Sequence, residues 1–206
     1  MNARYNGTLN DMLFPAGILQ PPFFNKQATD PVNFGAMGMV VGHELTHGFD
    51  DQGRKFDARG NLTDWWTPAS GKAFVERADC VKRQFDGYTV LDELHLNGGL
   101  TLGENVADLG GLKLAYAAMQ AYAREHPDRR PPEGRFTPEQ QFFLGTAQMW
   151  CTNATPEELR RRVATDPHAP PAYRVNGPMS NLLQFQQAFG CKAGDKMVAQ
   201  NRCEVW

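Results

Sequence analysis

The chain has 206 residues, of which 41% are hydrophobic and 11% aromatic, enough to form a buried core. Its 21 Lys and Arg nearly balance its 23 Asp and Glu, and this lack of basic excess argues against binding to nucleic acid. No apolar run approaches the roughly 18 residues that span a bilayer, and the polar start of the chain lacks the pattern of a signal peptide. We therefore expect one globular domain over residues 1–206, without a membrane segment and cytoplasmic if the sequence is complete.

The first 24 residues predict short extended segments. Two apolar runs flank Asn6-Gly7, a dipeptide typical of hairpin turns, and Pro21-Pro22 ends the second run. A helix is then expected over residues 30–48, with Asp30 as the N-cap and Pro31 at the first helical position. Its centre is apolar on nearly every face, which predicts deep burial.

Residues 49–66 are expected to form a loop, and Thr67-Pro68 predicts the start of the next helix. A further helix is expected over residues 102–125, and it contains Gly110-Gly111. Two glycines inside a helix cost about 1 kcal/mol each relative to Ala, so we expect them to allow a close backbone contact.

The last third of the chain predicts shorter elements. Capping boxes over 137–140 and 155–158 each begin a helix, a proline-rich loop is expected over 166–174, and a last helix over about 179–189. The predicted fold class is therefore mainly α with a small N-terminal β-sheet (α+β).

The most informative motif is His43-Glu44-Leu45-Thr46-His47, which is HExxH. On a helix, both imidazoles point to one side, one turn apart, and can bind one metal ion. Glu44 can then reach a metal-bound water as a general base, the arrangement of zinc peptidases. The apolar residues before His43 argue against a solvated surface helix, because buried histidines need partners.

A catalytic zinc needs a third protein ligand. The histidine that metzincins carry six residues after the second would fall on Gly53, which excludes that class. A carboxylate from the 102–125 helix is the alternative: Glu104 can ligate, and Asp108, one turn later, can accept the remaining ring N–H of His43. Such a site can also bind other divalent metals.

The segments VVGHELTHGFDDQGR and GENVADLGG resemble the neprilysin and endothelin-converting-enzyme family of zinc endopeptidases, including its bacterial members. NARY, FPAGILQPPFF and the closing CEVW also resemble family segments, so the likeness extends along almost the whole chain. It covers the C-terminal catalytic part, and the sequence lacks the N-terminal portion that usually precedes it. The resemblance implies a gluzincin with a thermolysin-like catalytic lobe.

The resemblance also implies a role for individual residues. His43, His47 and Glu104 match the ligands of one zinc ion per chain, Glu44 the general base, and Asp108 the carboxylate that orients a zinc histidine. The substrate would pair with Asn2 and Ala3 of the 1–24 strands, His168 of the 166–174 loop would stabilise the oxyanion, and Arg174 would hold a substrate carbonyl. The residues that match the S1′ pocket are Ile18, Phe23, Met39, Val40, Met149 and Trp150.

Further residues follow or depart from the family pattern. Cys80 and Cys203 match two family cysteines that form a disulfide, whereas Cys151 and Cys191 match two whose partners lie in the N-terminal portion. Arg4 stands where the family has an aromatic residue, although Tyr5 is kept. The Gly-x-Met-Glu-Asn segment of related aminopeptidases is not matched, because Gly35-Ala36-Met37-Gly38-Met39 has no Glu.

The expected function is a zinc-dependent endopeptidase that cleaves on the amino side of large hydrophobic residues, by Glu-assisted attack of zinc-bound water on a peptide or protein substrate. Without the family's capping lobe, the cleft is expected to accept larger substrates, and the uncovered face is expected to allow homo-oligomers. The alternative is a catalytically incompetent fragment that binds zinc or peptide. If the chain is a fragment of a typical family member, its location is expected to be extracytoplasmic.

Overall fold

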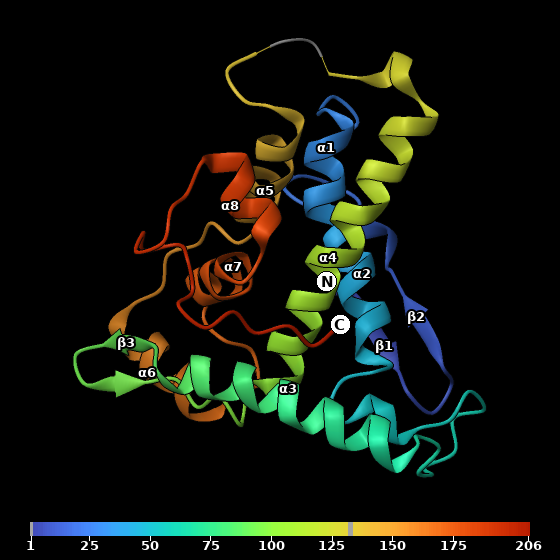
Figure 1. Ribbon diagram of the computed structural model, residues 1–206, viewed down its shortest axis with the longest axis vertical. Coiled ribbons are helices and arrows are strands. Elements are labelled where there is room, and N and C mark those ends of the chain that lie inside the picture. Colours follow the sequence, from blue (N-terminus) through green and yellow to red (C-terminus); the bar gives the residue numbers. More distant parts are fainter. Residues whose placement is uncertain (1, 132–133) are drawn as a thin grey trace.

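The computed structural model describes residues 2–131 and 134–206, and it is mainly helical with two small antiparallel sheets (Figure 1). The predicted fold class is confirmed, and a second sheet adds to it. None of the described helices is long and apolar enough to cross a bilayer.

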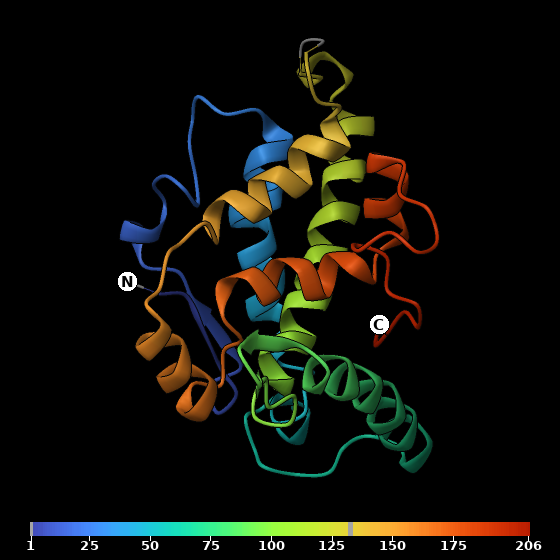
Figure 2. The ribbon, with the colours of Figure 1, turned by 90° about the vertical axis from the view of Figure 1, so that its left-hand side faces the viewer.

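Two helices at the centre of the molecule position the site. α2 (Met39–His47) and α4 (Leu102–Glu125) lie side by side in both views (Figures 1 and 2). Their backbones approach so closely that a Cβ on Gly111 would lie 2.7 Å from the backbone nitrogen of His43. A Cβ on Gly42 would lie 2.8 Å from the carbonyl oxygen of Gly111. The expected close contact at Gly110-Gly111 is therefore confirmed.

The helix predicted over 30–48 is present but consists of three parts. α1 (Asp30–Asn33) passes into a wider π-helical turn, η2 (Phe34–Gly38), and then into α2. Thr29, and not Asp30, is the N-cap. The wider turn lies against α5 (Pro138–Met149), where a Cβ on Gly35 would be 1.9 Å from the carbonyl oxygen of Phe142.

The N-terminal hairpin pairs β1 (Arg4–Asn6) with β2 (Asp11–Leu13), with Arg4 opposite Leu13. The prediction of its turn was wrong, because Asn6 ends β1 and the connection takes the four residues 7–10. The Asn6 side chain accepts hydrogen bonds from the backbone N–H and the hydroxyl of Thr8, which stabilises this longer turn. The short 3₁₀ helix η1 (Ala16–Ile18) follows.

α3 (Pro68–Asp86) begins as predicted, with the Thr67 hydroxyl accepting from the Ser70 N–H. The loop before it contains the 3₁₀ helix η3 (Gly53–Lys55). A disulfide joins Cys80 of α3 to Cys203 in the C-terminal tail, as the resemblance implies. A second hairpin, β3 (Thr89–Leu91) and β4 (Leu94–His95), was not predicted, because strands this short show no alternation.

The remaining helices surround this frame. They are η4 (Pro127–Arg129), α5 (Pro138–Met149), α6 (Pro156–Thr165), α7 (Pro171–Ser180) and α8 (Leu183–Phe189). The capping box of α5 is confirmed. That of α6 is half formed: Thr155 accepts from the Glu158 N–H, but the Glu158 carboxylate is bound by Arg161 and Arg162 instead.

Two boundaries in the last third were wrong. The 166–174 loop ends at Pro170, because Pro171 suits the first position of a helix and begins α7. Arg174 therefore lies on a helix and not in a loop. The predicted 179–189 helix is also shorter, since α7 ends at Ser180 and α8 begins at Leu183.

Candidate active site

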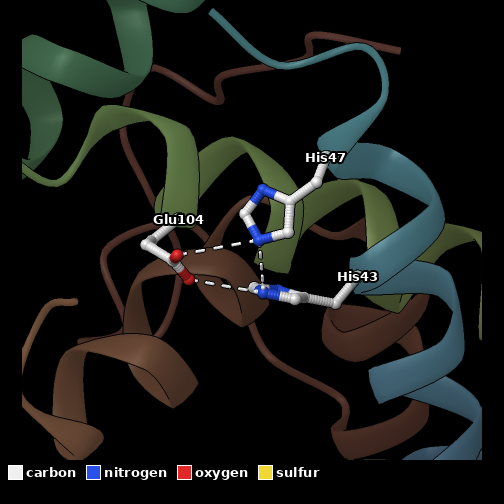
Figure 3. Close-up of side chains that lie close together, drawn as sticks. All are labelled: His43, His47 and Glu104. Carbon is white, nitrogen blue, oxygen red and sulfur yellow. Dashed lines mark hydrogen bonds and ion pairs between the residues drawn. The ribbon is translucent and has the colours of Figure 1, made fainter. Parts of the chain in front are cut away.

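Three possible metal ligands meet where α2 and α4 lie together (Figure 3). The Nε2 atoms of His43 and His47 are 2.9 Å apart. From α4, the Glu104 carboxylate places Oε2 3.3 Å from Nε2 of His43 and Oε1 3.6 Å from Nε2 of His47. The two histidines share one side of α2 because they are one helical turn apart, and the close approach of the helices brings Glu104 to them.

These three groups fit a zinc ion. In a tetrahedral site with bonds of about 2.0–2.1 Å, ligand atoms lie roughly 3.3 Å from one another, and the observed distances of 2.9, 3.3 and 3.6 Å fall around this value. Two imidazole nitrogens and a carboxylate are also a donor set that suits zinc. Three protein ligands leave a fourth position for water or substrate, as in catalytic zinc sites.

Each histidine has a carboxylate behind it. Oδ1 of Asp108, a fully buried residue of α4, lies 2.9 Å from Nδ1 of His43, close but not aligned as a hydrogen bond. Oδ2 of Asp50 lies 2.7 Å from Nδ1 of His47, within hydrogen-bonding distance. Carboxylates in these positions fix the ring orientation of metal-binding histidines.

Asp50 was missed in the sequence analysis. Its Oδ1 accepts the backbone N–H groups of Gln52 and Gly53, which holds the loop after α2 against the site. Gly53 has no room for a side chain, since a Cβ there would lie 1.7 Å from the carbonyl oxygen of His47. An acidic residue three positions after His47, at the start of a loop, is the signal that could have found it.

The buried charges shift the pKa values of this cluster. Burial alone would lower the pKa of His43, but the Asp108 and Glu104 carboxylates raise it to about 9. Burial likewise opposes ionisation of Glu104, yet His168, His43 and Arg174 hold its pKa far below the usual range. Burial raises the pKa of Glu44, against the opposing effect of the two histidines, which suits a group that must accept and return a proton.

Arg174 is the buried cation of the site. Its Nε and Nη2 donate to the two oxygens of Asp108 at 2.8 and 2.7 Å, and Nη2 also donates to Glu104 at 3.3 Å. The guanidinium lies over the ring of Trp150, 4.1 Å from its centroid. Arg174 therefore holds both Asp108, which lies behind His43, and Glu104, one of the three possible ligands, in addition to lining the cleft.

His168 comes from the loop before α7. Its Nε2 lies 3.2 Å from Oε1 of Glu104, and its Nδ1 lies 2.7 Å from Oδ1 of Asp166. Glu104 raises the pKa of His168, and Asp166 adds to this, although burial opposes it. Asp166, which the sequence analysis did not single out, thus fixes the ring with its other nitrogen toward the metal-ligand cluster.

A cleft of about 640 Å³ contains the ligands, Glu44, His168 and Arg174. Asn2 and Ala3 of the N-terminal segment also line it. Most of the residues expected for S1′ also line it and give it apolar surface: Ile18, Phe23, Met39, Val40 and Trp150. Met149 is the exception, because it is buried in the core at the end of α5, and only the next residue faces the cleft.

The two other cysteines lie outside this cluster. Cys151 is exposed and Cys191 half-buried, and both are free thiols in the structure.

A helix that carries HExxH, packed on a second helix that supplies a glutamate, defines the gluzincin class of metallopeptidase. The family model described as Peptidase family M13 matches residues 2–205, and the chain belongs to this family.

Similar proteins agree with this assignment. The chain is 49% identical to an endothelin-converting enzyme homolog of Locusta migratoria and 46% identical to neprilysin-2 of Drosophila melanogaster, in each case over its full length. It spans only 28% and 27% of those proteins. Among solved structures, inhibitor-bound zinc metalloprotease Zmp1 of Mycobacterium tuberculosis is 42% identical with a TM-score of 0.93, over 100% of this chain and 32% of that one. PepO of Lactobacillus rhamnosis is 37% identical with a TM-score of 0.85, over 97% and 30%.

Proposed function

We propose that this chain is a zinc-dependent endopeptidase that hydrolyses peptide bonds on the amino side of large hydrophobic residues. The observation that carries the proposal is the cluster of His43, His47 and Glu104, whose ligating atoms all lie within 4.8 Å of one another, beside Glu44 in one cleft. Relatives that are named as endothelin-converting enzymes, neprilysin and zinc metalloproteases support it.

His43, His47 and Glu104 would hold the zinc ion, with Asp108 and Asp50 fixing the two rings. Zinc bound there would supply a Lewis acid that polarises a carbonyl and lowers the pKa of water. Because both imidazoles must be neutral to ligate, the ion would displace the proton that the raised pKa of His43 retains.

Glu44 is the general base of this proposal. It is buried next to both histidines, and its raised pKa brings it nearer to the working pH. Glu44 takes the proton from the attacking water and then passes it to the leaving amine.

The other residues act on the substrate. His168 donates to the oxygen that gains negative charge during attack, and Asp166 keeps the ring in place for this. Arg174 lines the cleft and holds a substrate carbonyl, while its bonds to Asp108 keep it rigid. The substrate backbone pairs with Asn2 and Ala3.

Specificity follows from the apolar surface of the cleft. A large hydrophobic P1′ side chain buries its surface against Ile18, Phe23 and Val40, at about 25 cal/mol per Å² of apolar area. A peptide with a charged P1′ residue would lose this gain and should be cleaved more slowly.

A second possibility is a fragment that binds zinc or peptide without catalysis, because the chain spans less than a third of its relatives. Glu44→Gln separates the two: it should abolish hydrolysis and retain zinc if the chain is an enzyme. If the unmodified chain binds zinc but hydrolyses nothing, the fragment reading holds.

Acceptance of larger, unfolded proteins, self-association, an extracytoplasmic location and the use of zinc over other divalent metals stay predictions. Comparing cleavage of a short peptide with that of an unfolded protein, on a sample of measured solution mass, tests the first two.

A further inference from the structure

We propose that Arg4 makes the enzyme favour an acidic side chain at P1, the substrate residue just before the cleaved bond. This inference rests on the proposed function, and it concerns the end of the cleft opposite the apolar pocket. Arg4 lines the cleft, in β1, immediately after Asn2 and Ala3, the two residues proposed to pair with the substrate.

The strand places Arg4 on its outer face. Successive side chains of a strand point to opposite sides. Ala3 is buried in the core, and the Tyr5 hydroxyl would lie 3.2 Å from a Cβ on Gly48, the residue that follows α2, so both side chains lie on the inner face of the strand. Arg4, between them, belongs to the opposite face and is exposed to solvent.

The strand also has a direction relative to the cleft. Tyr5 lies beside Gly48, just after the end of α2. Two residues later, a Cβ on Gly7 would lie 3.1 Å from Phe56, in the loop that follows α2. Met39 and Val40, which belong to the proposed P1′ pocket, are the first two residues of α2 and so lie at its other end. The chain from Asn2 to Tyr5 therefore runs away from the P1′ pocket.

A substrate strand paired with this edge alternates in the same manner. If its P1′ side chain enters the apolar pocket on the α2 side, its P1 and P2′ side chains lie on the outer face, two residues apart. Asn2 and Arg4 are also two residues apart on that face. Because β1 leads away from the pocket, Arg4 is the neighbour of P1 and Asn2 that of P2′.

The charge of Arg4 is available for this contact. Three arginines line the cleft. Arg174 is bound to Asp108, and Nε of Arg162 lies 2.7 Å from a Glu158 oxygen. Arg4 forms no ion pair with any residue in the described ranges 2–131 and 134–206. Opposite charges directly across a strand pair attract, and like charges repel.

The test uses three quenched peptides that share Phe at P1′ and carry Glu, Gln or Lys at P1. At low salt, the zinc-loaded chain should cleave the Glu peptide with a kcat/KM about threefold higher than that of the Gln peptide. It should cleave the Lys peptide with a kcat/KM about threefold lower than that of the Gln peptide. Arg4→Glu should reverse the order, and Arg4→Tyr should remove the dependence on charge. Arg59→Glu is the matched control, since it changes the net charge equally from an exposed turn outside the cleft.

Reversal by Arg4→Glu but not by Arg59→Glu would support the proposal. An unchanged Glu-to-Lys ratio in Arg4→Glu, or the same change in Arg59→Glu, would overturn it. If Arg4→Glu is inactive on the Gln peptide, the Glu-to-Lys ratio of kcat/KM in Arg4→Tyr is used instead: a ratio near one supports the proposal, and an unchanged ratio overturns it. Cleavage of the Gln peptide by the unmodified chain tests the proposed function separately, so failure of the one is distinct from failure of the other.

Discussion

Arg174 and Asp108 form a bidentate ion pair inside the protein, with Nε and Nη2 donating to the two carboxylate oxygens at 2.8 and 2.7 Å. Asp108 is fully buried and also faces Nδ1 of His43. Although burial opposes ionisation of Asp108, the nearby Arg174 guanidinium lowers the pKa of Asp108, so a negative charge persists beside the His43 ring.

Asp108→Asn should therefore weaken both zinc binding and the fold. Loss of a carboxylate that orients a metal ligand typically costs about 10–100-fold in metal affinity. The buried Arg174 would also lose the closer of its two charged partners and keep only Glu104, at a cost of roughly 3 kcal/mol. Chelator competition and urea unfolding measure the two effects. Asp92→Asn, which breaks the exposed pair with Arg160, should change both by little. Equal effects of the two substitutions would contradict this account.

Gly111→Ala should disturb the site through the backbone. Its Cβ would lie 2.7 Å from the backbone nitrogen of His43 and 2.8 Å from the carbonyl oxygen of Met39, so α2 must shift. We expect a loss of about 1–3 kcal/mol in unfolding free energy and weaker zinc binding. Gly71→Ala on α3 should be neutral or slightly stabilising, because among the described residues, outside the helix's own backbone, its Cβ would approach only Nη1 of Arg54, at 3.8 Å. Thermal unfolding of both variants measures the difference in stability. A stable, zinc-replete Gly111→Ala protein would show that the two helices are not in fixed contact.

The metal-free chain should lose stability as the pH rises. The pKa of His43 is raised from 6.5 to about 9 because Asp108 and Glu104 outweigh burial. The protonated ring thus stabilises the fold fully below pH 6.5, and this contribution is lost as the pH rises through about 9. His168 shifts in the same direction. Urea unfolding of chelator-treated protein across this range measures the trend, which His43→Gln should flatten. A stability that increases over the same range would be inconsistent with the described cluster.

Local patterns predicted much of the fold and of the site. The spacing of His43 and His47, the cap at Thr67 and the glycine pair at 110–111 each depend on neighbours within one or two helical turns. The helix, the helix start and the close backbone contact that these patterns imply could therefore be predicted from the sequence alone.

Asp50, Asp166 and the second hairpin were missed although they are local, whereas the other missed features depend on contacts between distant segments. The Arg174–Asp108 pair joins α7 to α4, and the π-helical turn lies where Gly35 meets Phe142 of α5. The choice of Trp150 over Met149 for the cleft depends on how α5 is rotated against the core. Hydrophobic periodicity within one segment does not predict which distant segment it will contact.

The most direct test of the central claim combines zinc content with cleavage of an internally quenched peptide that carries Phe at P1′, for the unmodified chain, the chelator-treated chain and Glu44→Gln. We expect one zinc per chain and internal cleavage before Phe that chelator abolishes. Glu44→Gln should keep its zinc and lose about 10²–10⁴-fold in kcat. Cleavage that survives in Glu44→Gln, or zinc bound without cleavage by the unmodified chain, would contradict the assignment of this chain as a zinc endopeptidase.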